Sequence, residues 1–306
     1  MIAFLEWAGR HARWILSLGC IAAMFLPSIS AALRPVLPAL VSMVLALAMA
    51  RIDLGATLRA SLRPGRLLHL LLIATLLLPV TALVYGGVGR LIGSAYHPSL
   101  VYLAAAPPIA SAAGLCFLLG FNARLAVEVT VATTLLTPVL GPLAIKLALP
   151  DTDIAVDQIA LVFRLAGMVA GGAIGALAIR AIVGPDRIAA NGRIFDGIAA
   201  FGMLLFVFPV FDRVPQVILA DPGRATFVFA LCLVFNFGAN LAVRSASLGW
   251  FGPPEAGAAG LLMGNRTIAM YLAALPFEPV FAMFVALYQF PMYFTPLLMS
   301  RFRIDT

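Results

Sequence analysis

Ten long apolar runs, separated by short connections, dominate this sequence and restrict what it can fold into. Hydrophobic residues make up 63% of the 306 residues and charged residues 11%, whereas soluble domains contain about 25% charged residues. A helix of about 20 apolar residues crosses the hydrocarbon core of a bilayer. The pattern therefore predicts an all-α membrane protein, a single integral unit over residues 1–306, with spans at about 13–31, 35–52, 67–89, 98–121, 123–149, 157–182, 194–212, 224–246, 254–275 and 278–300.

The basic residues favour one orientation of these spans in a cell inner (plasma) membrane. The net charge is +7, from 20 Lys and Arg against 13 Asp and Glu. If both termini are cytoplasmic, 13 basic residues lie on the cytoplasmic side, 5 lie on the other side, Arg34 among them, and Arg164 and Arg266 lie within spans. An excess of basic residues is typical of cytoplasmic loops. We therefore expect the positive charge to face the lipid bilayer rather than nucleic acid. The first run is expected to be a retained span and not a cleaved signal peptide, since an even number of spans fits this bias.

Two spans end in a similar motif, which suggests an internal duplication. The sequence reads Leu-Thr-Pro-Val-Leu at 136–140 and Phe-Thr-Pro-Leu-Leu at 294–298. The motifs lie five spans apart, and an odd number of spans per half places the second half in the opposite orientation, as in inverted-repeat transporters. We therefore expect a first five-span repeat in residues 1–150 and a second, inverted repeat in residues 151–306.

Glycines recur at four-residue spacing in the sixth span, at Gly167, Gly171 and Gly175. A stripe of small residues on one helix face lets another helix approach closely in lipid. The pattern predicts helix packing rather than ligand binding.

The fourth span of each half contains residues that interrupt a helix. In the first half, Pro107 and Pro108 remove two backbone donors and are followed by small residues, among them Ser111. In the second half, a glycine precedes three polar residues, Asn265-Arg266-Thr267, in an otherwise apolar run. Transporter sites form where interrupted helices expose backbone groups near the bilayer midplane. We expect the two interruptions, with Pro108, Ser111, Asn265, Arg266 and Thr267, to form a substrate-binding site.

Arg266 is the most informative single residue. A guanidinium in the middle of a membrane costs at least about 2.5 kcal/mol and is tolerated when it faces a cavity, an anion or a carboxylate. Because apolar residues flank it on both sides, we expect it to contact an anionic solute in a water-filled pocket. The alternatives are an arginine that reaches the membrane surface near a helix end and a structural ion pair.

The fifth span combines one acid with several hydroxyls. Glu128 lies four residues after Arg124, so a local ion pair is one interpretation, and proton coupling or a pair with Arg266 is the other. Thr130 and Thr134 share a helix face. Their hydroxyls are candidates for substrate contact if that face points to the interruptions, although such hydroxyls often bond their own backbone.

Amides in the eighth and tenth spans are further candidates. Asn236 and Asn240 share one helix face, as do Gln289 and Tyr293. Such amides commonly join helices to one another, and Asn236 and Gln289 could alternatively contact substrate. We expect neither a cofactor nor a catalytic group, since no histidine or carboxylate pair lies in mid-span.

Together these features resemble the bile acid:sodium symporter superfamily, in its ten-span bacterial branch. The resemblance rests on the proline-led fourth span, the threonine-rich fifth span ending at Thr137-Pro138, Asn236, and Met263-Gly264-Asn265. It implies a panel of spans 1, 2, 6 and 7, a core of spans 3, 4, 5, 8, 9 and 10, and interrupted spans 4 and 9 that cross. It also implies a secondary transporter of a small organic anion, since the substrates of that family are mostly organic anions taken up with sodium.

Several positions that hold sodium ligands in that family carry other residues here. A Ser-Asn pair reads Ala112-Ala113, an acid reads Gly260, and a Gln reads Gly264. Few side-chain oxygens are thus available to sodium. The reduced sodium site comprises Ala112, Ala113, Thr130, Gly260, Met263 and Gly264.

Two hypotheses on coupling follow. Arg266 could supply the positive charge that sodium would otherwise supply, and Glu128 could carry a proton, so the protein would be a uniporter or proton-coupled. The alternatives to organic anion transport are export of a metalloid or other anion and, from another class, a membrane-embedded enzyme or structural membrane protein.

Overall fold

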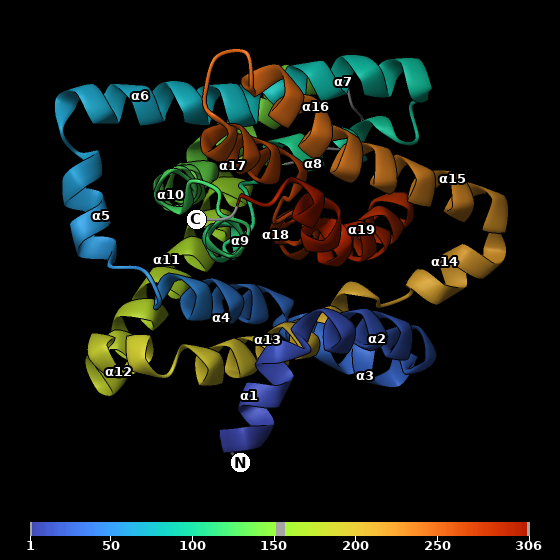
Figure 1. Cartoon of the computed structure of the whole chain (residues 1–306). Coiled ribbons are helices and arrows are strands. Elements are labelled where there is room, and N and C mark those ends of the chain that lie inside the picture. The colour runs from blue at the N-terminus through green and yellow to red at the C-terminus, as the bar shows by residue number, and fades with distance from the viewer. Residues whose placement is uncertain (1, 151–156, 305–306) are drawn as a thin grey trace.

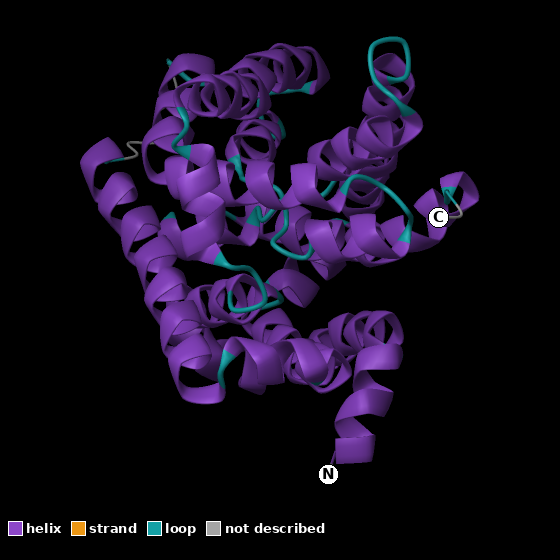
Figure 2. Ribbon diagram, turned by 60° about the vertical axis from the view of Figure 1, so that its left-hand side comes forward, coloured by secondary structure: helices purple, strands orange, loops and turns teal. Residues whose placement is uncertain are grey.

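The computed structural model describes residues 2–150 and 157–304, and its regular elements there are helices joined by short loops (Figure 2). This confirms the predicted all-α class.

Large apolar side chains such as Leu91 and Ile182 are more than four-fifths exposed, as expected for surfaces that face lipid rather than water. The chain is therefore a multi-pass membrane protein. Within the described residues, seven continuous helices are long and apolar enough to cross a membrane: Pro27–Met49, Pro64–Ile92, Ala123–Ala148, Gln158–Val183, Gly192–Val210, Pro222–Ser247 and Pro279–Phe302.

One group of helices packs together in the lower part of Figure 1. It contains the N-terminal helices and two helices from the second half of the chain. Helix α13 contacts α1, α2, α3 and α4, and α4 also lies along α11. The members are α1 (Ile2–Arg10), α2 (Ala12–Phe25), α3 (Pro27–Leu33), α4 (Leu37–Met49), α11 (Gln158–Val183) and α13 (Gly192–Val210).

The second group surrounds α10 and α19, which are among the most buried helices of the protein. Helix α10 contacts helices from both halves of the chain. The members are α6 (Pro64–Thr75), α7 (Thr81–Ile92), α8 (His97–Ala105), α9 (Ala112–Leu118), α10 (Ala123–Ala148), α15 (Pro222–Leu233), α16 (Ala239–Ser247), α17 (Pro253–Gly264), α18 (Ala269–Ala274) and α19 (Pro279–Met299). Three short helices connect elements: α5 (Leu54–Ser61), α12 (Pro185–Ala190) and α14 (Val214–Ala220).

Two of the long helices contain a π-helical segment. Leu76–Val80 joins α6 to α7, and Val234–Gly238 joins α15 to α16. The first contains Pro79, which lacks an N–H, and the second contains Asn236. Such segments widen a helix by one residue and frequently occur at functional sites.

The predicted boundary between the first two spans is wrong. We expected a connection near Arg34, outside the membrane, but the chain turns at Leu26 and then stays helical from Pro27 to Met49. Proline disfavours helical backbone in the residue before it, and this ends α2 at Leu26. Arg34 lies within the helical run, where it donates hydrogen bonds to the carbonyls of Pro209 and Leu272.

The glycine stripe of α11 packs against α4, as predicted, at two of its three positions. A Cβ built on Gly175 would lie 2.8 Å from the Ala46 Cβ, and one built on Gly171 would lie 3.1 Å from the Ser42 Oγ. A Cβ built on Gly167 would have no other atom within 4 Å. Two glycines therefore allow close helix packing, whereas the third borders open space.

Gly175→Leu should lower the free energy of unfolding by roughly 1–3 kcal/mol, because a leucine side chain must push α4 away. The matched variant Gly167→Leu should leave stability nearly unchanged. Thermal melts of both variants in the same detergent measure the difference. Equal melting temperatures would contradict the packing described here.

Candidate functional site

The first interruption separates α8 from α9. Helix α8 ends at Ala105, and Ala106 is extended, with φ −77° and ψ 145°. Pro107 and Pro108 follow, and the next helix begins at Ala112. Both prolines lack the N–H that would continue the helical hydrogen bonds, and Pro107 forces the residue before it out of helical geometry. The interruption lies where the sequence predicts it.

The second interruption separates α17 from α18. Helix α17 ends at Gly264, and Asn265 is extended, with φ −115° and ψ 103°. Helix α18 begins at Ala269. No proline lies here, so hydrogen bonds from polar side chains must compensate for the lost helical bonds.

The two interruptions are hydrogen-bonded to each other. They run antiparallel and form an isolated β-bridge between Pro108 and Arg266, the one bridge in the described part of the chain. Backbone groups that leave a helix inside the membrane need partners within the protein, and each interruption supplies them to the other. The bonds run from Ile109 N to Asn265 O at 2.9 Å, from Thr267 N to Pro107 O at 2.8 Å, and from Thr267 Oγ1 to Pro108 O at 3.1 Å.

Arg266 lies between the C-terminal ends of two helices. Its Nη1 donates to Ala106 O at 3.0 Å, after the end of α8, and its Nε donates to Met263 O at 2.9 Å, at the end of α17. Nη2 contacts the Met263 sulfur at 3.0 Å. A helix C-terminus carries a partial negative charge of about half an electron charge. The guanidinium is therefore held by two carbonyls at ends that favour a cation.

The predicted water-filled pocket around Arg266 is not found. The residue is 2% exposed, so the surrounding protein encloses the guanidinium. None of the ion pairs formed by residues 2–150 and 157–304 includes Arg266. The positive charge is balanced by helix ends rather than by a carboxylate.

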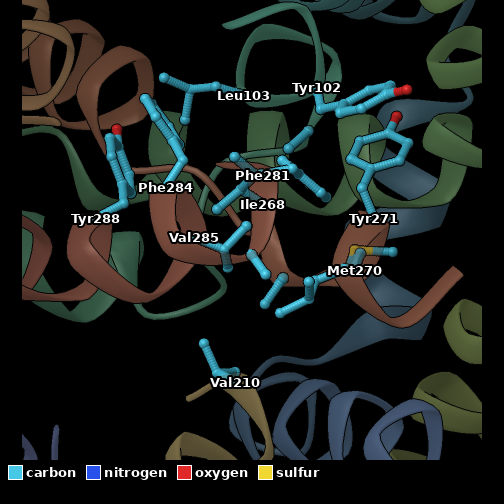
Figure 3. Close-up of a cluster of buried hydrophobic side chains, with 14 of the residues drawn as sticks. Tyr102, Leu103, Val210, Ile268, Met270, Tyr271, Phe281, Phe284, Val285 and Tyr288 are labelled. Carbon is cyan, nitrogen blue, oxygen red and sulfur yellow. The ribbon is translucent and has the colours of Figure 1, made fainter. Parts of the chain in front are cut away.

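Two tyrosines bond the last carbonyls of the same two helices. The Tyr271 hydroxyl donates to Ala105 O at 3.0 Å, and the Tyr288 hydroxyl donates to Gly264 O at 2.5 Å. Figure 3 shows them at opposite ends of one buried cluster, Tyr271 beside Tyr102 and Tyr288 beside Phe284. Sequence reasoning missed both tyrosines, because an aromatic residue in an apolar run gives no sign that its hydroxyl has a specific partner.

Asn236 joins three helices at the second interruption. Its Nδ2 donates to Gly264 O at 2.5 Å and contacts Asn265 Oδ1 at 3.4 Å, and its Oδ1 accepts from Thr295 Oγ1 at 2.7 Å. Asn240 accepts a bond from Asn265 Nδ2 at 3.3 Å. Asn236, Asn240, Asn265 and Thr295 are all fully buried. Of the two interpretations of these amides, the structure supports the one in which they join helices.

The remaining predicted residues do not bond to the interruptions. Thr130 is 4% exposed and its hydroxyl has no partner, while Thr134 is buried one turn further along α10. Gln289 donates to Val285 O on its own helix, and its Oε1 has no partner. Ser111 precedes α9 and is exposed. Of the predicted substrate-binding residues, only Pro108, Asn265, Arg266, Thr267 and Asn236 belong to the bonded cluster at the interruptions.

Glu128 forms an ion pair, but not with Arg266. Its Oε1 accepts from Arg124 Nε at 3.0 Å, and its Oε2 accepts from Arg66 Nε at 2.8 Å and from Arg66 Nη2. The predicted local pair with Arg124 is therefore present. The alternative pair with Arg266 is wrong, because the Arg266 guanidinium bonds Ala106 and Met263 instead and forms no ion pair among the described residues. Sequence reasoning missed Arg66, which lies 62 positions earlier.

The reduced sodium site is also closed sterically. A Cβ built on Gly260 would lie 2.5 Å from Asn240 O, and one built on Gly264 would lie 2.5 Å from Asn236 O. A carboxylate or amide side chain at either position has no space, since α16 packs directly on α17. Ala112 and Ala113 offer no oxygen, and Met263 contacts Arg266 instead. The residues present do not fit a sodium ion.

A cavity of about 500 Å³, open at the surface of the protein, lies between α4, α11 and α18. Its wall is mainly apolar and contains one charged side chain, Arg164, which is exposed and donates to Ala274 O at 2.6 Å. The open space beside Gly167 belongs to this cavity. The lining residues are Pro38, Ala39, Ser42, Phe163, Arg164, Gly167, Met168 and Ala273.

No family model matches the chain, and no curated protein matches it.

Asn236→Ala should lower the free energy of unfolding by roughly 1–3 kcal/mol, because buried partners lose their hydrogen bonds. Asn191→Ala is the control, since Asn191 is exposed and bonds only the carbonyl of Arg187. Thermal melts of both variants test this. If the two changes have equal effects, the Asn236 cluster does not stabilise the interruption.

Proposed function

We propose that the protein is a secondary transporter that carries a small organic anion across the cell inner membrane. The observation that carries this proposal is the pair of interrupted helices, bonded to each other at their interruptions. Irregular backbone inside a membrane costs free energy and is found where it is enclosed by protein or lines a cavity. Many transporters form their binding sites from interrupted helices that cross. A purely structural membrane protein has no need of such an arrangement.

Three pairs of features support ten spans in two inverted repeats. If α1–α2 count as the first span and the interrupted pairs α8–α9 and α17–α18 each count as one, the seven long helices become ten spans. The third span of each half then has a π-helical segment, and the fourth has an interruption. The fifth span of each half has a Thr-Pro motif in the C-terminal half of its helix. The matching order favours the repeats 1–150 and 151–306.

The two packing groups match the panel and core that the resemblance to the bile acid:sodium symporter superfamily implies. In this numbering, the first group contains spans 1, 2, 6 and 7, and the second contains spans 3, 4, 5, 8, 9 and 10. The resemblance is therefore supported by packing as well as by motifs. The excess of basic residues in one set of connections favours cytoplasmic termini.

The cavity beside Arg164 is our candidate binding site for the solute. It lies between the two groups, where α4 and α11 face α18. Its volume of about 500 Å³ is within the range of small-molecule sites. An apolar wall with one guanidinium suits a solute that has an apolar body and one carboxylate. A relative motion of the two groups would open such a cavity to either side of the membrane.

Uptake into proteoliposomes tests this function. Purified protein should accumulate at least one radiolabelled organic monocarboxylate from a panel, and protein-free liposomes should not. Arg164→Gln should weaken uptake about 10- to 100-fold in kcat/KM, since it removes a charge-assisted hydrogen bond. Gly167→Leu should block uptake by filling the cavity, whereas Gly65→Leu, at an exposed position with open space, should not. No uptake of any organic anion would contradict the proposal.

Glu128→Gln should leave the pH dependence of that uptake unchanged. Both carboxylate oxygens are bound by arginines, so we assign Glu128 to holding α6 against α10 rather than to carrying protons. Initial rates of the variant and the wild type between pH 5.5 and 8.5, normalised at one pH, check this. Loss of the pH dependence in the variant would instead support proton coupling through Glu128.

A further inference from the structure

We infer that Arg266 is a built-in cation that occupies the place of a mobile coupling ion, so that the crossing of the two interrupted helices forms without sodium. The part of this inference that concerns transport rests on the proposed function. The part that concerns binding and stability does not.

The ligands of Arg266 are those that a metal cation would use. Its two oxygen partners are backbone carbonyls at the C-terminal ends of α8 and α17. Unwound carbonyls and half-helix C-termini are general ligands for sodium inside membranes, because their partial negative charges sum at such a point. Here one guanidinium donates hydrogen bonds to both carbonyls. A side chain cannot dissociate, so the cation is permanent.

The residues around the Arg266 guanidinium accommodate its positive charge but leave no place for a second cation. Met263 contributes a neutral sulfur, and Gly260 and Gly264 leave no space for an acid. Carboxylates of the described residues make no ion pair with Arg266. A sodium ion at this place would meet a fixed like charge and few free oxygens. The site is therefore already filled.

Arg266 contacts both interruptions, through its backbone and through its side chain. Its backbone forms the β-bridge with Pro108, while its side chain turns back to Met263 and across to Ala106. One residue therefore ties both interruptions together. Without the guanidinium, two carbonyls at helix ends would lose their cation in a buried setting.

Thermal melts in detergent, at constant ionic strength, test the inference without any transported solute. The wild-type melting temperature should be the same in sodium, potassium and choline chloride. Arg266→Ala should melt at least roughly 5 °C lower, and about 10 mM guanidinium should restore part of the loss by filling the vacated site. Urea, which has a similar shape and no charge, should not restore it. Arg63→Ala, at an exposed position, is the control and should show neither effect.

Two outcomes overturn the inference. One is a wild type that sodium stabilises and potassium or choline does not. The other is an Arg266→Ala variant that melts like the wild type. If Arg266→Ala does not fold, the wild-type salt series still decides the question, and Arg266→Lys, which keeps a charge, should fold and remain indifferent to sodium.

Uptake measurements separate this inference from the proposed function. Wild-type proteoliposomes should transport the organic anion equally well with sodium and with potassium on both sides. Uptake that requires sodium contradicts the built-in cation and supports the transporter. Absence of uptake in both salts contradicts the transporter, while the melting experiments still test the cation site.

Discussion

The structure depends on how backbone groups are satisfied where two helices stop in the buried interior of the protein. Water does not reach these groups, so an unpaired N–H or C=O there costs about 1–3 kcal/mol. This chain meets the requirement by pairing the two interruptions with each other through a short antiparallel contact. Side chains satisfy the carbonyls that this contact does not pair. They are the amide of Asn236, the hydroxyls of Tyr271 and Tyr288, and the guanidinium of Arg266.

Arginines bond carbonyls at helix ends in more than one place in the protein. Arg266 bonds the ends of α8 and α17, and Arg164 bonds Ala274 O at the end of α18. Arg34 donates to Leu272 O, also near the end of α18. Each guanidinium is thus placed where helix dipoles favour a cation. Because Arg34 and Arg164 belong to the first packing group and α18 to the second, the same type of contact also joins the two groups.

Local features and the meeting of the two interruptions were predictable from the sequence, whereas most side-chain contacts between distant residues were not. Apolar runs and prolines act on their own segment, so the helices and the interruption at Pro107 and Pro108 follow from them. The turn at Leu26 was missed because Arg34 and Pro35 resemble a connection, although Arg34 finds carbonyl partners inside the protein. The partners of Glu128, Tyr271 and Tyr288 depend on which helices become neighbours, and a single sequence carries no signal of that kind.

The most direct test of the central claim is an experimental structure of the protein in lipid nanodiscs, prepared in potassium with no sodium present. The account predicts that α8 and α9, and α17 and α18, are interrupted and joined at Pro108 and Arg266. It also predicts that the guanidinium lies within hydrogen-bonding distance of the carbonyls of Ala106 and Met263. Continuous or separated helices, or an Arg266 side chain at the membrane surface, would contradict it.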